Sequence, residues 1–508
     1  MSRLTKISLL LAVFFGLDKV IGFVRQIIIA RQFGFSADLD AFNAANNLPD
    51  LLYMLISGGA LAMAFIPVLT EVLTEEGRPQ AWQLFSRIAN LAFLVTGLMA
   101  LVTALVAEPL VGWELGIAPG FNSDQQRLVA ELMRLNLIGT LIFSISGLVM
   151  SGLQANQHFL LPAMAPLLYN VGQIFGALVL SPKEGVSLGP VTLPAFGMGV
   201  HGLLYGVIIG AVLHLAIQIP GLIHYQFRWT PGLALKDARV RQVLSLLGPR
   251  VLTMLFIQII FMARDNLASH LATGAVSALT YGWMIMQVPE TLIGTAIGTA
   301  MLPTLAEFYA RKDFKGLGET IDRAVRVLMS LTIPAAAILA FGVGPLLSVA
   351  FKLDAAAEAT LLMVSQAYLV GLMGHSLLEV ATRSFYAQQN ARMPMYVSAL
   401  NVTLFILFSL GLMQVMGAAG IALANSLSYT IEALLLFYLL SRKLPVRFNW
   451  LPVGLRALLA GGLGLALTLG LLAVLPLRGL FAAPLAMLAG MLVALPFIWK
   501  EVRLLLKL

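Results

Sequence analysis

The sequence predicts an all-α integral membrane protein of about fourteen transmembrane helices, in two six-helix lobes related by a pseudo-two-fold axis along the membrane normal, plus two C-terminal helices. Three observations predict this class: the composition, the length of the apolar segments and an internal repeat. Of the 508 residues 59% are hydrophobic and 11% charged, whereas soluble domains carry about 25% charged residues. The chain is therefore expected to lie in a bilayer.

The composition excludes several kinds of chemistry. The chain has no cysteine, so disulfides and thiolate metal sites are excluded, and its histidines do not fall at metal-ligand spacing. We find no phosphate-binding loop and no dinucleotide fingerprint. We therefore expect no cofactor, no metal and no enzyme activity; a coupling cation cannot be identified, and transport would draw on ion gradients or membrane potential.

Cutting the chain at polar, proline or glycine breaks gives fourteen segments that can each span a bilayer, which takes about 20 apolar residues. They are 7–34, 40–74, 83–112, 126–154, 160–181, 195–223, 243–270, 274–309, 320–350, 356–388, 394–416, 418–441, 452–475 and 479–499.

Basic residues orient these segments. They cluster after the even-numbered helices, at Arg228/Lys236/Arg239/Arg241, Arg311/Lys312/Lys315/Arg323/Arg326 and Arg442/Lys443/Arg447. By the positive-inside rule these loops and both termini are cytoplasmic, which predicts a multi-pass membrane protein. The net charge of +8 then reflects topology and contact with anionic lipid. We expect a monomer that binds no nucleic acid.

Three sequence pairs recur in the same order. Pro49-Asp50 followed by "IPVLTE" (66–71) recurs as Pro289-Glu290 followed by "LPTLAE" (302–307). The stretch "LQANQHFLLPAMAPLLYN" (153–170) recurs as "YAQQNARMPMYVSALN" (386–401), and a Gly-x-x-Gly at 199–202 recurs at 417–420. Six helices separate the copies, so both halves face the same way, with a cavity expected between them.

The repeat defines the expected domains. Residues 1–224 form an N-terminal lobe of helices 1–6, 225–242 a cytoplasmic linker and 243–443 a C-terminal lobe of helices 7–12. Residues 444–508 hold helices 13 and 14 and a cytoplasmic tail.

Polar side chains form stripes on the first two helices. Asp18, Lys19, Gly22, Arg25 and Gln26 share one face of helix 1. Helix 2 carries a second stripe, made of Asn43, Asn46, Asn47, Asp50, Tyr53 and Ser57 with Asp40 at its edge. Charges at membrane depth cost about 3 kcal/mol or more each, so they are expected to face water or one another. Pro49 and Pro289, read as mid-helix, would allow kinks that suit gating helices.

The second half adds Arg264, Asp265, Gln287, Glu290, His375, Glu379 and Glu432. Structural roles are open for several residues. Lys19 and Arg25 could pair with Asp18, Asp40 or Asp50, and Glu379 and Glu432 could be neutral acids between helices. His375 could be a packing residue, and Arg264 could lie near its helix exit.

A cavity lined by cations favours an anionic cargo, and arginine matches phosphate geometry. The substrate-binding candidates are Lys19, Arg25, Asp40, Asn47, Asp50 and Arg264, and the gating or coupling candidates are Asp18, Pro49, Glu290 and Glu379. We expect Arg264 to point into the cavity from the second lobe, facing Lys19 and Arg25. Asp265 is expected to be a weak partner for it, because sequence neighbours diverge by about 100° on a helix.

Six segments resemble the MurJ (MviN) family of lipid II flippases, within the multidrug/oligosaccharidyl-lipid/polysaccharide exporter superfamily. They are "DKVIGFVRQIIIARQFG" (18–34), "DAFNAANNLPDLL" (40–52), "AFIPVLTE" (64–71), "IGTAIGTAMLPTLAEF" (293–308), "FYAQQNARMP" (385–394) and "GAAGIALANSLSY" (417–429). The resemblance implies a V-shaped, two-lobed transporter. It would move undecaprenyl-pyrophosphate-linked disaccharide pentapeptide to the outer leaflet by alternating access for peptidoglycan synthesis.

The match to the family motif is partial at the charged positions. Arg25 and Asp40 match it, Lys19 stands where the family has arginine, and Gln26 stands where it usually has an acid. Tyr53, Gly58 and Met284 replace an arginine, an acid and a second arginine of the family. Arg264 could stand in for a missing cation.

The leading hypothesis is a flippase for lipid II. The alternatives are an exporter of another polyprenyl-linked glycan such as a teichoic or capsule intermediate, a drug antiporter of the superfamily, and a non-transporting scaffold that binds a lipid intermediate. An antiporter would present acids rather than arginine in the cavity, and a scaffold would have closed ion pairs and no cavity.

Overall fold

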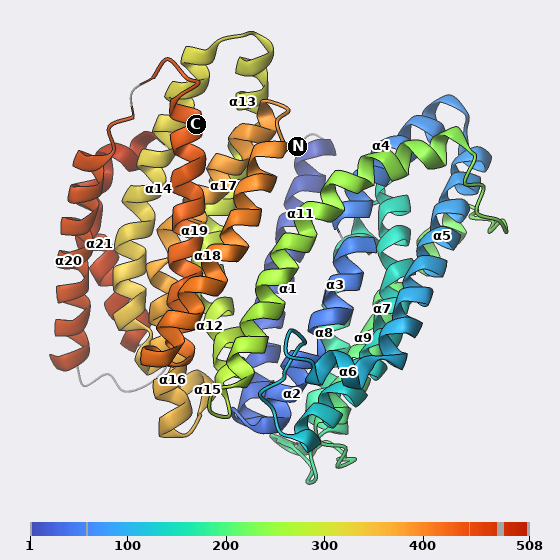
Figure 1. Ribbon diagram of the computed structural model, residues 1–508, viewed down its shortest axis with the longest axis horizontal. Helices are drawn as coiled ribbons and strands as arrows, with labels where there is room; N and C mark the ends of the chain where they lie inside the picture. The colour runs from blue at the N-terminus through green and yellow to red at the C-terminus, as the bar shows by residue number, and fades with distance from the viewer. Residues whose placement is uncertain (1–2, 57–58, 447, 475–481, 505–508) are drawn as a thin grey trace. The chain divides into compact units, whose positions relative to one another are not determined.

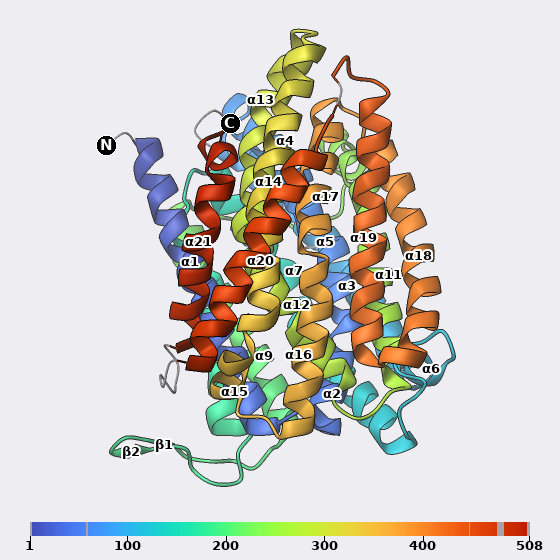
Figure 2. The same cartoon turned by 90° about the vertical axis from the view of Figure 1, so that its left-hand side faces the viewer.

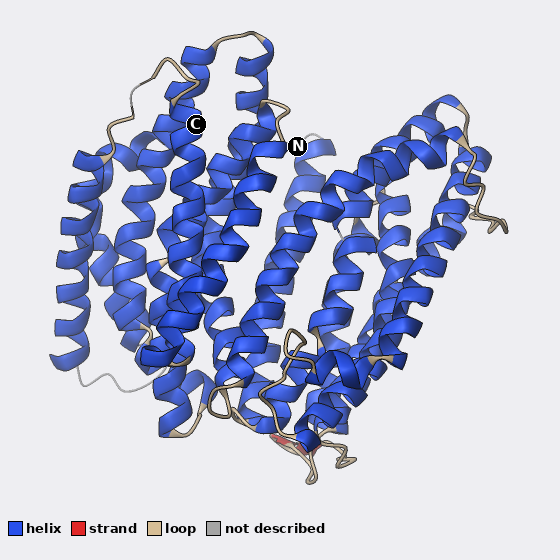
Figure 3. Cartoon of the chain, viewed as in Figure 1, coloured by secondary structure: helices blue, strands red, loops and turns tan. Residues whose placement is uncertain are grey.

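The computed structural model describes residues 3–56, 59–446, 448–474 and 482–504. Ser57 and Gly58, named above, lie outside them. The described chain is an α-helical membrane protein, and its strands form a single short hairpin (Figure 3). The chain divides into two compact units, Met1–His270 and Leu271–Leu508. The predicted class, an all-α membrane protein, is confirmed.

Unit 1 runs from blue to green in Figure 1. Its elements are α1 (Arg3–Phe33), α2 (Ala37–Ala45), α3 (Asn47–Ile56), α4 (Gly59–Glu75), α5 (Arg78–Leu105), α6 (Ala107–Gly112), α7 (Ser123–Ala155), α8 (Leu160–Phe175), the π-helical turn η1 (Gly176–Leu180), β1 (Ser187–Leu188), β2 (Val191–Thr192), α9 (Val200–Ala216), α10 (Ile219–His224) and α11 (Ala238–Ser269). The antiparallel β1–β2 hairpin extends beyond the helices of this unit (Figure 2).

The core of unit 1 lies between α4, α5, α7 and α11. Aromatic rings of Phe65, Trp82 and Phe85 pack there against Leu148 and Val240. Trp82 also donates its indole N–H to the carbonyl of Tyr225 at 3.0 Å, as buried tryptophans usually do. The connection between α10 and α11 is therefore fixed to the bundle.

The helices α8 and α9 of unit 1 approach each other closely, because glycines of one helix face glycines of the other. A Cβ on Gly172 would lie 2.4 Å from the backbone of Gly210, and one on Gly176 would lie 2.7 Å from Gly206. Small residues allow such close backbone contact in membrane helices. This contact fixes α8, which carries Asn170 toward α1.

Unit 2 runs from lime green through yellow to red in Figure 1. Its elements are α12 (Ala275–Glu290), the π-helical turn η2 (Thr291–Thr295), α13 (Ala296–Ala310), α14 (Phe314–Gly342), α15 (Gly344–Phe351), α16 (Ala355–Val370), α17 (Leu372–Ala387), α18 (Arg392–Met416), α19 (Ala418–Ser441), α20 (Leu451–Val474) and α21 (Ala482–Val502).

The core of unit 2 lies between α13, α14, α17 and α19, with Leu305, Leu328, Phe385 and Phe437 at its centre. The helices α20 and α21, predicted to follow the repeat, pack on α14. A Cβ on Gly464 would meet the carbonyl of Gly490 at 2.6 Å, so these two helices also touch through glycine.

Ten helical segments of the described chain are long and apolar enough to cross a membrane, or eleven if the bent pair α16 and α17 forms one span. The expected spans 7–34, 40–74 and 243–270 coincide with helices α1, α2–α4 and α11, which are not among the ten within the described residues. The count of fourteen stays a prediction.

The boundary between the compact units falls after α11 rather than at the expected linker, residues 225–242. Helix α11, expected to begin the second lobe, packs against α3, α4 and α5 of unit 1. The symmetry between helices 1–6 and 7–12 stays a prediction.

Candidate functional site

An aspartate, an asparagine and an arginine of unit 1 form a chain of hydrogen bonds between α1 and α8. Asn170 donates from Nδ2 to Oδ1 of Asp18 at 2.8 Å and accepts at Oδ1 from Nη1 of Arg25 at 2.7 Å. Asp18 and Arg25 are partly exposed, and Asn170 is buried. The predicted stripe of α1 is therefore connected to α8 through one amide.

Lys19 lies beside this chain on α1. Its side chain is exposed, whereas the next turns of the helix bury Ile29 and Ala30. An exposed cation at this position can meet an anion without breaking an existing buried pair. Its predicted role in binding stays a prediction.

Asp40 is buried in the first turn of α2. Ser36 caps this helix by accepting a hydrogen bond from the N–H of Leu39. A carboxylate in the first turn interacts favourably with the helix dipole, and Asp40 is 1% exposed. The burial favours a structural contribution from Asp40 alongside the predicted binding role.

The predicted second helix is interrupted at Asn46, which ends α2 before α3 begins at Asn47. The side-chain oxygen of Asn46 accepts a hydrogen bond of 2.7 Å from Asn136 of α7. Pro49 lies in the first turn of α3, and the break at Asn46 falls within the turn before it, where a proline removes a helical hydrogen bond; its gating role stays a prediction.

Asp50 follows Pro49 and is exposed, although it lies between the buried residues Pro49 and Leu52. Tyr53, one turn further, packs against Phe143 of α7, with the two tilted rings 5.4 Å apart between their centroids. An aromatic contact thus occupies the place where the family motif carries an arginine. Asp50 is the exposed acid of this helix face.

Arg264 of α11 forms an ion pair with its neighbour Asp265, with 2.7 Å between Nε and Oδ1. Asn47 donates a hydrogen bond of 2.8 Å to the other oxygen of Asp265. The side chains of Arg264 and Asp265 are 9% and 1% exposed. The expectation that Asp265 is a weak partner is wrong, because the long arginine side chain bends back to the adjacent carboxylate.

The guanidinium of Arg264 also lies 5.2 Å from the ring of Phe261, one turn earlier on α11. Helix α11 packs within unit 1, so Arg264 belongs to the first compact unit. The expectation that it points into the cavity from the second lobe stays a prediction. Whether it faces Lys19 and Arg25 stays a prediction.

Unit 2 brings Glu290 and Glu379 together with a residue that the sequence analysis did not select. Arg383 binds Glu379 through Nε at 3.0 Å and Nη2 at 2.5 Å, one turn along α17. Glu290 accepts hydrogen bonds from Thr295 at 3.1 Å and from Thr291 at 3.4 Å. Both Glu379 and Arg383 are close enough to Glu290 to interact with it electrostatically.

Backbone geometry positions this group. Pro289 directly precedes Glu290, and the π-helical turn η2 follows it; such turns interrupt α-helices frequently at functional sites. Gly298 of α13 leaves room for Arg383, because a Cβ there would lie 2.9 Å from its Nε. The three charged side chains are therefore held between α12, α13 and α17.

Glu432 and His375 find hydrogen-bond partners within unit 2. Glu432 accepts hydrogen bonds from Ser398 at 2.6 Å and Asn401 at 2.7 Å. His375 bonds Asn425 at 3.1 Å and contacts the ring of Tyr429. These contacts fit the structural readings left open for both residues.

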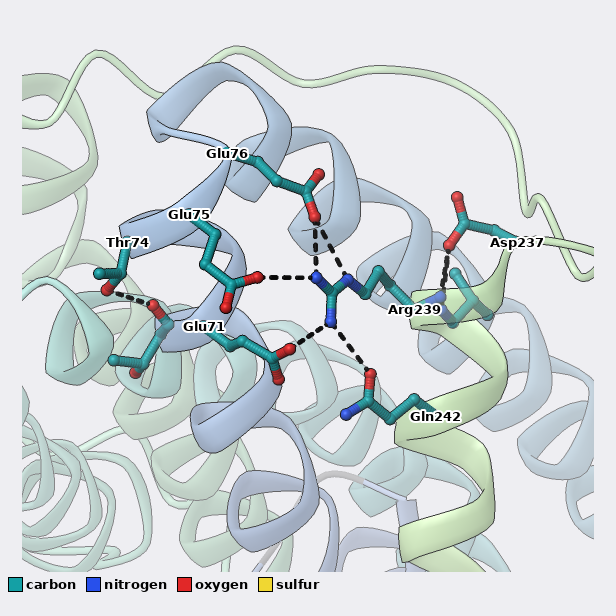
Figure 4. Close-up of polar contacts among 9 residues, drawn as sticks. Glu71, Thr74, Glu75, Glu76, Asp237, Arg239 and Gln242 are labelled. Atoms are coloured by element: carbon teal, nitrogen blue, oxygen red, sulfur yellow. Dashed lines mark hydrogen bonds and ion pairs between the residues drawn. The ribbon is translucent and has the colours of Figure 1, made fainter.

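A separate charged cluster connects α4 to the start of α11 (Figure 4). Arg239 binds Glu71 at 2.5 Å, Glu75 at 3.2 Å and Glu76 at 3.0 Å. Hydrogen bonds to Glu71 and Glu76 raise the pKa of Arg239 above its ordinary value. Glu71 closes the repeated "IPVLTE" motif; its counterpart Glu307 instead binds Arg311.

The sequence analysis did not select Asn170, Asn136 and Arg383, because its polar stripes were drawn on the first two helices, whereas these residues lie on α7, α8 and α17. A signal for Asn170 was present: the repeat ends on Asn170 in one copy and Asn401 in the other, and both bind a carboxylate. Within the described residues, no three histidine or acidic side chains are grouped so as to hold a metal.

Comparison with known proteins gives one family. The model of "Lipid II flippase MurJ" matches residues 29–495. The lipid II flippase MurJ of Burkholderia cenocepacia is 30% identical over 83% of this chain and 80% of its own length. The probable lipid II flippase MurJ of Vibrio cholerae is 26% identical over 86% of this chain and 82% of its own length.

Solved structures give the same fold. A lipid II flippase MurJ in an inward closed conformation superposes with a TM-score of 0.79 and 21% identity, covering 98% of this chain and 100% of the other. An inward-facing multidrug transporter of the MATE family and MOP superfamily superposes with a TM-score of 0.67 and 12% identity. The match covers 84% of this chain and 94% of the other. The chain belongs to the MurJ family of lipid II flippases.

Proposed function

We propose that this protein is a transporter that moves lipid II, the undecaprenyl-pyrophosphate-linked peptidoglycan precursor, from the inner to the outer leaflet of the bacterial inner membrane. The family membership supports the function class. The observation that carries the assignment to specific residues is Arg25, held on the polar face of α1 by Asn170. The role follows from chemistry: an arginine at membrane depth matches a phosphate oxygen pair.

In this proposal Arg25 and Lys19 bind the pyrophosphate. Arg25 is partly exposed and Lys19 exposed, so both can reach a bound anion. Asn47 and Asp50 on α3 and Asp40 on α2 then contribute to the polar surface that receives the sugar and peptide groups. Arg264 acts through its buried pair with Asp265 and Asn47, which fixes the neighbouring part of α3.

Movement between leaflets proceeds by alternating access, with both termini in the cytoplasm. Because the sequence carries no nucleotide-binding motif, membrane potential or a cation gradient supplies the drive. Glu290 and Glu379 are the coupling candidates; both lie beside Arg383 and near the π-helical turn η2. Protonation or cation binding there would change the local charge balance and bias α12 against α17. No resident cofactor is involved, and the protein acts as a monomer.

A second candidate is the export of another polyprenyl-linked glycan. It is favoured by one observation: Tyr53 and Met284 stand where the family motif has arginines, and Tyr53 packs on Phe143. Fewer cations would suit a headgroup with less negative charge, such as a polyprenyl monophosphate.

The test is complementation of a bacterial strain depleted of its own lipid II flippase. Wild-type protein should restore growth and rod shape, and an equally expressed Arg25→Ala variant should not. Growth with both would remove Arg25 from the site, and growth with neither would favour the second candidate or a non-transporting scaffold. Binding of purified protein to lipid II separates these last two, because a scaffold still binds.

A further inference from the structure

Three partly exposed aromatic side chains of unit 1 form a continuous group across α3, α7 and α8. Phe143 of α7 lies in the middle: its ring centroid is 5.4 Å from that of Tyr53 on α3 and 5.0 Å from that of Tyr169 on α8. The rings of Phe143 and Tyr169 meet nearly edge to face, at 80°, which aromatic pairs favour. These three residues are called the aromatic cluster below.

A buried polar group supports the aromatic cluster on its inner side. His214 of α9 contacts Phe143, with 5.2 Å between the ring centroids. Its Nδ1 lies 2.6 Å from the hydroxyl of Ser146, and Gln218 donates to the same hydroxyl at 2.9 Å. His214, Ser146 and Gln218 are each 5% exposed or less. The central ring of the cluster is therefore fixed in place before a ligand arrives, which lowers the cost of ordering a site on binding.

Charged side chains border the aromatic cluster. Asp50 lies one turn before Tyr53 on α3 and is exposed, and it is close enough to Tyr53 to interact with it electrostatically. Tyr169 interacts in the same way with Asp50 and with Arg25 of α1. The cluster thus places two phenol rings beside a carboxylate, next to the arginine proposed to bind the pyrophosphate.

The chemistry of the substrate limits what can lie against this cluster. In lipid II the pyrophosphate has two covalent neighbours, the polyprenyl chain and the first sugar. A polyprenyl chain placed there would cover the carboxylate of Asp50 without giving it a hydrogen-bond partner, which is unfavourable. A sugar ring can pack its C–H face on a phenol ring while its hydroxyls bond the carboxylate and the tyrosine hydroxyls. The cluster therefore fits the sugar better than the chain.

We propose that Tyr53 and Tyr169 bind the sugar that is attached to the pyrophosphate, and that they determine a preference for lipids that carry a glycan. This inference rests on the proposed function, in which Arg25 binds the pyrophosphate. It also gives a role to Tyr53, which stands where the family motif has an arginine. An aromatic ring at this position exchanges a charge contact with the phosphate for a packing contact with the sugar.

The experiment compares two probes on purified full-length protein in nanodiscs. One is undecaprenyl pyrophosphate, and the other is the same lipid carrying a single N-acetylglucosamine and no peptide. The ratio of the two Kd values isolates the contribution of the sugar. Wild type should bind the sugar-bearing probe about tenfold more tightly. Tyr53→Leu and Tyr169→Leu should each reduce this ratio about threefold to fivefold and leave the affinity for undecaprenyl pyrophosphate close to that of wild type.

Tyr205→Leu is the matched control. Tyr205 of α9 is an exposed tyrosine of the same unit that does not belong to the aromatic cluster. Its replacement should leave the ratio at the wild-type value. An equal fall in the ratio for Tyr205→Leu and the two cluster variants would show a general effect of losing a tyrosine, and would overturn the proposal.

If the leucine variants do not fold, Tyr53→Arg replaces them, because the family motif carries arginine at this position. This variant should bind undecaprenyl pyrophosphate at least as tightly as wild type, since it adds a cation. Its preference for the sugar-bearing probe should fall, because the phenol ring is gone. A wild-type ratio in Tyr53→Arg would overturn the sugar contact.

The outcomes separate this inference from the proposed function. A ratio near one in wild type, or a wild-type ratio in the leucine variants, overturns the sugar contact, and restored growth in the complementation test then leaves the proposed function standing. The expected ratios in a protein that does not move lipid II overturn the proposed function and leave this inference standing. Binding of neither probe overturns both.

Discussion

Asn47 of α3 donates a 2.8 Å hydrogen bond to Asp265 of α11, and the same carboxylate pairs with Arg264. Two helices separated by more than two hundred residues are thereby joined through a buried acid. Removing a hydrogen bond to a buried charge costs about 1–3 kcal/mol, and removing one member of a buried ion pair costs about 3–5 kcal/mol.

The first prediction concerns this connection. Asn47→Ala and Asp265→Asn should each lower the unfolding temperature in detergent, the second by more. Because both act on one carboxylate, the double variant should lose less stability than the sum of the two single losses. Additive losses would contradict the proposed linkage of α3 to α11.

The second prediction concerns Arg25. Arg25→Ala should abolish lipid II transport and leave the amount of folded protein unchanged, because a partly exposed cation contributes little packing. Arg25→Lys should retain part of the activity, since lysine keeps the charge but not the two-pronged geometry. Arg134→Ala is the control: Arg134 pairs with the exposed Glu108 on the same unit, and its loss should leave transport intact.

The third prediction concerns Gly22. Gly22→Ala should be nearly neutral, because a methyl group would lie at ordinary contact distance from the amide of Asn170. Gly22→Leu should displace that amide and reduce transport several-fold at equal expression. Equal transport by both variants would show that the position of the Asn170 amide does not matter.

The fourth prediction compares two ion pairs of unit 2, each between a glutamate and an arginine one helical turn apart. The pair Glu379–Arg383 has side chains 34% and 23% exposed, and the pair Glu307–Arg311 has side chains 58% and 72% exposed. A double-mutant cycle on the unfolding free energy should give a coupling of about 1 kcal/mol for the first pair and close to zero for the second. Equal couplings would argue against a special environment around Glu379.

The fifth prediction concerns the cluster of Arg239 with Glu71, Glu75 and Glu76 (Figure 4). Arg239→Ala should speed chymotrypsin cleavage at the exposed Trp229 and Leu235 in the preceding connection. Added salt should raise the wild-type rate toward that of the variant, because exposed charges are screened. Arg241→Ala is the control, since Arg241 donates a hydrogen bond to the carbonyl of Leu235 rather than to this acidic cluster; a salt-independent difference would exclude an electrostatic cause.

The sequence predicted the membrane class and the positions of the long helices because a bilayer leaves the backbone few alternatives. It indicated a kink near Pro49, but the bond that Asn136, distant in the chain, makes to Asn46 at the break could not be read from it. The predicted division of the helices into lobes stays a prediction, because a repeat in sequence says nothing of which neighbours a helix packs against.

The candidate site, like the fold, could be predicted from the sequence only in part. The stripe of Asp18 and Arg25 follows from helical periodicity, but their separation by Asn170 depends on the approach of α8. The pairing of Arg264 with Asp265 was missed because a helical wheel records the direction of Cβ and ignores the reach of a long side chain.

The most direct test of the account is lipid II translocation by purified protein in proteoliposomes. Fluorescent lipid II is placed in both leaflets, a potential is applied, and an impermeant reductant quenches the outer leaflet. With wild type the protected fraction should disappear, and with Arg25→Ala it should remain as in protein-free vesicles. Protection that persists with the wild-type protein, while it binds lipid II, would contradict the assignment as a flippase.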